Sequence, residues 1–167
     1  MTLGLSPSAF TTLHVIISLV GIVSGLMAVV GMLMGERPGG ITALFLLTTV
    51  LTSATGFLFP FAQLLPSHMI GILSLVLLAI ACIALYIQKL AGPWRWIYVL
   101  TALVSLYLNV FVLIIQSFLK LGPLHALAPS IPPSEPPFAI VQGIVLLFFV
   151  VVIIGALRRF RPTAGFA

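Results

Sequence analysis

The chain has 167 residues, of which 62% are hydrophobic and only 5% are charged. Because soluble domains carry about 25% charged residues, this composition excludes a soluble globular protein and predicts one transmembrane domain over 1–167. In a soluble protein a net charge of +5 would suggest a nucleic-acid partner. Here the positive charge is explained by Lys and Arg at the cytoplasmic ends of helices, where these residues set the orientation of the protein and contact anionic lipid. We therefore expect no nucleic-acid binding.

Five apolar segments are long enough to cross a bilayer as helices, which takes about 20 residues each. The first span covers about 8–34 and ends at the charged, Gly- and Pro-containing turn 35–40. The second covers 41–61, and only a short connection separates it from the third, 67–88, so these two spans must be antiparallel neighbours. The fourth covers 94–119 and the fifth 138–157. No Lys or Arg precedes the first span, which predicts a retained helix rather than a cleaved signal peptide.

The segment 122–137 differs from the rest because it holds six prolines. Proline lacks the backbone N–H and fixes φ, so we expect extended chain with no helix here. Unpaired carbonyl groups do not lie in lipid, which predicts a loop across the outer face. The expected fold is therefore an all-α membrane protein: a bundle of five transmembrane helices with a proline-rich outer loop.

Charge predicts the orientation of this bundle. When the spans are threaded alternately, six of the seven basic residues fall on one side and only Lys120 on the other. By the positive-inside rule, the N-terminus lies outside and the C-terminus lies in the cytoplasm.

Two helix faces carry small or polar residues at helical spacing. The first span has one stripe and the fourth span another: His14, Ser18, Gly21, Gly25 and Ala28, and then Ser105, Asn109, Gln116 and Lys120. Membrane helices pack through such faces, so both stripes should point into the bundle. An amide in mid-membrane needs a partner, and the hydroxyls of the second span are candidates: Thr48, Thr49, Thr52, Ser53 and Thr55. The stripes fit either plain packing seams or a polar track for a proton, an ion or a quinone head group.

Several polar side chains fall at the outer end of the threaded bundle. His14 and His68 begin parallel spans there, so if these helices are adjacent the two imidazoles would reach one haem iron or metal ion. His125 and Glu135, in the proline-rich loop, form a weaker metal pair. Asn109, Gln116, Lys120 and Gln142 would form a polar pocket. The alternative is that each histidine simply bonds to a carbonyl group or to water.

The sequence offers little support for nucleophilic catalysis, phosphate binding or dithiol redox chemistry. There is no nucleophile elbow, no phosphate-binding glycine loop and no Asp to orient a histidine, so we expect no catalytic residues. The single cysteine, Cys82, excludes a dithiol oxidoreductase.

Three segments carry a family resemblance: 67–75 (SHMIGILSL), 106–120 (LYLNVFVLIIQSFLK), and 134–138 (SEPPF) with Gln142. Over roughly residues 40–162 the chain resembles small multi-pass inner-membrane proteins of proteobacteria. That family has no established activity, so the resemblance implies a bacterial inner-membrane location and no catalytic residues.

The sequence thus predicts a non-enzymatic binding or accessory subunit with a polar pocket in the outer leaflet. Its expected partners are membrane lipid and either another membrane protein or a second copy of the chain. The alternative is a small electron carrier that holds b-type haem or quinone through His14 and His68. A transporter of a small uncharged or lipidic solute is a third hypothesis.

Overall fold

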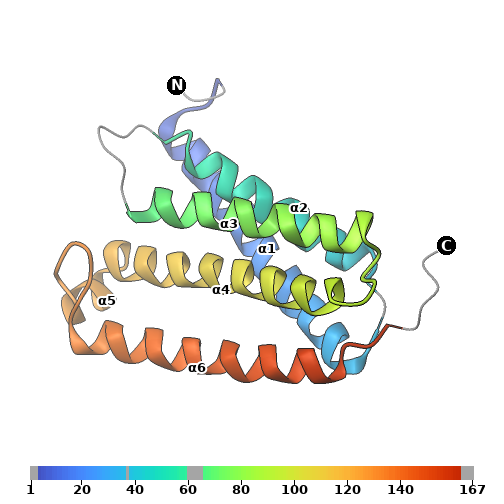
Figure 1. Ribbon diagram of the computed structural model, residues 1–167. Helices are drawn as coiled ribbons and strands as arrows, with labels where there is room; N and C mark the ends of the chain where they lie inside the picture. The colour runs from blue at the N-terminus through green and yellow to red at the C-terminus, as the bar shows by residue number, and fades with distance from the viewer. Residues whose placement is uncertain (1–3, 37, 60–65, 163–167) are drawn as a thin grey trace.

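Helices make up all the regular structure in the part of the chain that the structure describes, residues 4–36, 38–59 and 66–162 of a computed structural model (Figure 1). Their order is α1 (Pro7–Met34), α2 (Gly40–Gly56), α3 (Pro66–Cys82), the π-helical η1 (Ile83–Ile87), α4 (Trp94–Lys120), α5 (Gly122–Leu127) and α6 (Pro136–Arg159). Four are long and apolar enough to cross a membrane: α1, α3 with η1, α4 and α6. The chain is therefore a helical membrane protein.

Helix α4 is the centre of the bundle. It packs against α1, α2, α3, α5 and α6, whereas α1 packs mainly on α2 and α3 mainly on α4. In Figure 1, α4 runs between α3 and α6, and α1 crosses behind. Its inward residues Tyr98, Leu103 and Leu106 are fully buried. By contrast, α6 leaves most of its apolar surface exposed, as expected of a helix that faces lipid.

The ends of α1 follow from its sequence. Ser6 accepts a hydrogen bond from the Ala9 N–H at 3.2 Å, and Pro7 occupies the first turn, where no N–H is needed. Gly35 ends the helix in the left-handed region, at φ 74°, where a residue without Cβ is unstrained.

The small-residue stripe of α1 faces the bundle, as predicted from its spacing. Gly21, Gly25 and Ala28 are all buried. A Cβ placed on Gly25 would lie 2.6 Å from Leu106 Cδ1 and 2.9 Å from Phe45 Cδ2. Glycine at this position therefore permits the close approach of α1 to α2 and α4.

One basic residue joins two helices at the end of the bundle where α4 begins and α6 ends. The Arg95 guanidinium donates from one nitrogen to the carbonyl oxygens of Leu157, at 3.1 Å, and Phe160, at 2.6 Å. The last carbonyls of a helix have no partner within the helix, and they lie at its negative end, so an Arg satisfies both needs.

The expectation of a helix-free loop over 122–137 is wrong at both ends of that segment. Residues 122–127 form the short helix α5, with Pro123 in its first turn, and α6 begins at Pro136 rather than at Phe138. In both places proline occupies the first turn, where its missing N–H leaves no helical bond unmade. The prolines between these helices lie in irregular chain.

Helix α2 is also shorter than the predicted span 41–61. It ends at Gly56, followed by a turn over 57–59, and the last two predicted residues lie outside the described ranges. With 17 residues, α2 is shorter than each of the four candidate spans, of which α3 together with η1 is the shortest at 21 residues.

Candidate functional site

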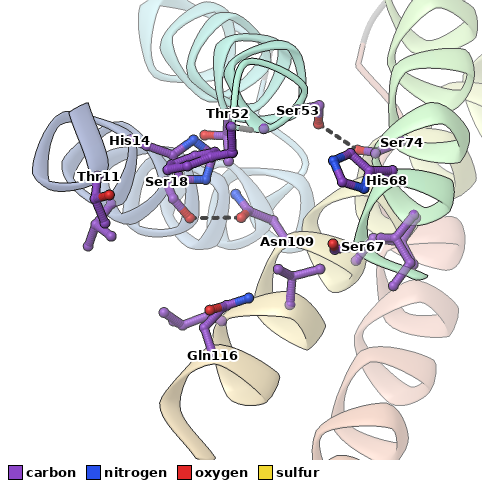
Figure 2. A pocket seen from close by; sticks show the side chains of 18 of the residues that line it. Thr11, His14, Ser18, Thr52, Ser53, Ser67, His68, Ser74, Asn109 and Gln116 are labelled. Carbon is purple, nitrogen blue, oxygen red and sulfur yellow. Dashed lines mark hydrogen bonds between the residues drawn. The ribbon is translucent and has the colours of Figure 1, made fainter. Parts of the chain in front are cut away.

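A cavity of about 500 Å³ opens between four helices, at the end of the bundle where α4 finishes and α3 begins. This volume lies within the range of about 300–1,000 Å³ typical of small-ligand sites. The residues that line it come from α1, α2, α3 and α4 and from the turns that follow α2 and α4. They include the polar side chains labelled in Figure 2, together with Ser117 and Lys120.

His14 is fixed by α2. Its Nδ1 lies 2.8 Å from Thr55 Oγ1, and the Thr55 hydroxyl donates its own proton to the Leu51 carbonyl at 2.6 Å. The Thr55 oxygen can therefore only accept from His14, which places a proton on Nδ1. In the neutral imidazole, Nε2 then keeps the lone pair that can accept a hydrogen bond or ligate a metal.

Asn109 is the most deeply placed amide of the cavity, with a side chain only 8% exposed. Its Oδ1 accepts a hydrogen bond of 2.9 Å from the Ser18 hydroxyl. Its Nδ2 is buried and has no hydrogen-bond partner among the described residues. The observed partner is thus on α1, whereas the sequence pointed to the hydroxyls of the second span.

His68 lies on the other side of the same cavity. Its side chain is 6% exposed, and its ring packs against Phe57 with 5.6 Å between centroids. Figure 2 shows His14 and His68 on opposite sides, with Asn109 between them. Helices α1 and α3 are not among the closely packed pairs. Instead, α2 and α4 each pack against both of them. The two histidines therefore share a cavity, but not through adjacent helices.

The other predicted pocket residues divide into two groups. Gln116 and Lys120 line the cavity, one and two turns closer to its mouth than Val112. Gln142 does not: it is buried on α6, and its Nε2 donates to the Phe111 carbonyl at 3.1 Å. Gln142 thus joins α6 to α4 and lies outside the cavity lining.

His125 and Glu135, the weaker metal pair, differ in their surroundings: Glu135 is hydrogen-bonded within its own turn, and His125 has a ring nitrogen without a partner among the described residues. Glu135 accepts hydrogen bonds from the Ser130 hydroxyl, the Ser130 N–H and the Ser134 N–H. The Ser130 hydroxyl, with these N–H groups, lowers the pKa of Glu135 to about 2. His125 lies on α5, and its Nδ1 is buried without a partner in the described part of the chain. Within residues 4–36, 38–59 and 66–162, no three His, Cys, Asp or Glu side chains gather as a metal site.

Sequence reasoning missed the hydroxyl partners that join the helices around the cavity. Thr55 meets His14, Ser18 meets Asn109, and the Ser53 and Ser74 hydroxyls lie 3.2 Å apart between α2 and α3. Ser18 and Thr55 were visible in the sequence as polar residues of apolar spans, but their partners depend on which helices pack together.

A scan of protein-family models and searches of curated proteins and of solved structures find no match to this chain. In the described lining, the only permanently charged group is the Lys120 ammonium, and no side chain carries a carboxylate. With apolar walls and a few polar groups, such a cavity can bind an amphiphilic molecule by burial and hydrogen bonding.

Proposed function

We propose that this protein is a bacterial inner-membrane protein with five spans, in which α2 is the fifth and shortest and the proline-rich segment lies outside. The N-terminus then lies outside the cell and the C-terminus in the cytoplasm. Three observations support this orientation: Arg95 lies against the end of α6, Arg158 and Arg159 are exposed there, and Lys120 lies at the opposite end of α4.

We infer that its function is to bind an amphiphilic ligand in the outer leaflet, as a non-enzymatic binding or accessory subunit. The observation that carries this inference is the cavity of about 500 Å³ between α1, α2, α3 and α4. The buried amide nitrogen of Asn109, in its lining, has no hydrogen-bond partner among the described residues. A buried donor without a hydrogen bond costs about 1–3 kcal/mol, so binding of a ligand that accepts from the Asn109 amide nitrogen is favoured.

The hydroxyls around the cavity support binding rather than catalysis. The hydroxyls of Thr52 and Thr55 donate to carbonyls of their own helix, at 2.8 and 2.6 Å. Because His14 donates to Thr55 instead of accepting its proton, the pair is not arranged as a nucleophile with a general base.

Native mass spectrometry of the protein, purified in mild detergent, tests this function. We expect a small-molecule adduct on the wild type that is lost in Val112→Trp, which fills the cavity. The adduct should remain in Val151→Trp, because Val151 is 61% exposed on α6. A wild type without an adduct, even after incubation with a lipid extract, would contradict ligand binding.

The second candidate is an electron carrier that holds b-type haem or quinone. It is favoured by the hydrogen bond from His14 to Thr55, which leaves Nε2 unprotonated in the neutral ring, and by the presence of His68 in the same cavity. For haem, a Soret band should appear in the wild type and in His125→Ala, and should be lost in both His14→Ala and His68→Ala. A colourless, metal-free protein from haem-replete cells would exclude haem.

A further inference from the structure

Three side-chain N–H donors follow one face of α4 along the cavity. Asn109, Gln116 and Lys120 are spaced by seven and four residues, which places them on the same side of a helix, and all three line the cavity. From Asn109 to Lys120 the row covers about 16 Å of the helix axis, at about 1.5 Å per residue. The row thus runs from the buried floor of the cavity to its mouth.

Within the described residues, these donors are unpaired. Asn109 Nδ2 is buried without a partner, and neither Gln116 nor Lys120 has a hydrogen bond or ion pair with another described residue. Carboxylates, the strongest acceptors in proteins, are absent from the described lining. The hydroxyls of Thr11, Thr52 and Ser117 donate to carbonyls of their own helices, so toward a ligand their oxygens only accept, and the N–H donors for a ligand come from the α4 row.

The wall between the donors is apolar. Val112 and Leu113 lie between Asn109 and Gln116 on α4, and Ile70, Phe57 and Phe59 contribute from the other side. Such walls favour a hydrocarbon or ring portion of a ligand, at about 25 cal/mol for each Å² of apolar surface removed from water.

We propose that the cavity selects amphiphiles whose head group carries hydrogen-bond acceptors, a carbonyl or a carboxylate, and rejects cationic head groups. This proposal rests on the proposed binding function and adds the ligand class. A carbonyl oxygen satisfies Asn109 Nδ2, while a carboxylate gains in addition the long-range attraction of the Lys120 ammonium near the mouth of the cavity. An ammonium head would leave the Asn109 donor unpaired and would repel Lys120.

Three ligands that share a straight chain of twelve carbons and differ in the head group test this selectivity: dodecanoate, methyl dodecanoate and dodecylammonium. Their Kd values are to be measured by native mass spectrometry on the full chain in detergent. We expect dodecanoate and methyl dodecanoate to bind about tenfold more tightly than dodecylammonium, the effect of one hydrogen bond gained. Equal or tighter binding of dodecylammonium would overturn the head selectivity while leaving the binding function standing.

Variants then separate the two acceptor chemistries. Asn109→Leu should weaken both oxygen-headed ligands about tenfold, whereas Lys120→Gln should weaken dodecanoate alone. Gln88→Leu and Lys89→Gln, at the far end of the bundle, are the matched controls and should change neither. If Asn109→Leu does not fold, Gln116→Leu replaces it, because Gln116 bonds to no other helix within the described residues and should weaken both ligands.

The outcomes distinguish the two proposals. If neither Asn109→Leu nor Lys120→Gln changes the Kd of either oxygen-headed ligand, the donors on α4 do not contribute to binding of the head group. The proposed selectivity is then wrong. If no ligand of the series binds at all, the binding function fails and the selectivity fails with it.

Discussion

Single hydrogen bonds from side chains join several pairs of neighbouring helices in this bundle. Ser18 joins α1 to Asn109 of α4, Ser53 and Ser74 join α2 to α3, and Gln142 joins α6 to α4. In a membrane such bonds add about 0.6 kcal/mol each on average, and the hydrophobic effect does not hold helices together there. At the scale of residues, the fold therefore depends on a few polar contacts that can be tested one by one.

Arg95 should be among the most sensitive of these residues. In Arg95→Met the carbonyls of Leu157 and Phe160 lose a charged donor, and we expect the free energy of unfolding to fall by about 1–3 kcal/mol. The measurement is unfolding by SDS in mixed micelles. Arg158→Met is the control: Arg158 is exposed, so its loss should change the stability by less than about 0.5 kcal/mol. Equal effects of the two variants would contradict the role of Arg95.

Glu135 should titrate far below a normal glutamate. Because its pKa is lowered from 4.5 to about 2, its hydrogen bonds to Ser130 and Ser134 stabilise the turn fully above about pH 4.5. That contribution is lost as the pH falls through about 2. The carbon-13 shift of the Glu135 carboxylate should show this midpoint, and Ser130→Ala should raise it. A wild-type midpoint near 4.5 would contradict these hydrogen bonds.

At the scale of elements, Gly25 is the described glycine at which an added Cβ would come closest to another helix. Gly25→Ala would place a methyl group 2.6 Å from Leu106 Cδ1, so we expect it to lower the free energy of unfolding by about 1–3 kcal/mol. Gly143→Ala, on α6, has no neighbour within 4 Å of the new methyl and should leave stability unchanged or slightly higher. If both variants behave alike in SDS titration, the close packing at Gly25 is not as described.

The periodicity of the sequence predicted which helix faces turn inward, but not which helices meet. Gly21, Gly25 and Asn109 are buried as their spacing indicated, because the 3.6-residue period is a local property. The partner of Asn109 depends on how helices distant in the chain pack, and local spacing does not determine that. Likewise, the rule that proline breaks helices predicted a loop at 122–137, yet Pro123 and Pro136 lie in the first turns of helices.

For the whole molecule, the proposed orientation gives a direct prediction. A reporter fused after Ala167 should give a cytoplasmic signal, and one inserted near Ser130 a periplasmic signal, because basic residues gather at the other end of the bundle. Fusions of an alkaline phosphatase and a fluorescent protein at each site serve as mutual controls. Reversed signals would place the cavity in the inner leaflet.

The candidate site could be predicted only in part. The sequence placed His14, His68, Asn109, Gln116 and Lys120 at one end of the bundle, and all five line the cavity. Gln142 was assigned to the same pocket from its depth in the membrane, but depth does not specify the direction in which a side chain points. Its amide faces Phe111 instead.

The short length of α2 makes the thickness of the bilayer relevant to the site. Its 17 residues extend about 26 Å, less than the hydrocarbon core of about 30 Å. Thr52, Ser53 and Gly56, in its last turns, line the cavity, so the helix ends where the cavity lies. Thinning of the lipid beside α2 is one way to match its length, at a fraction of a kcal/mol per Å. Lengthening the acyl chains of the membrane therefore increases this hydrophobic mismatch at the wall of the cavity, and lipid composition can act on occupancy without any contact with the ligand.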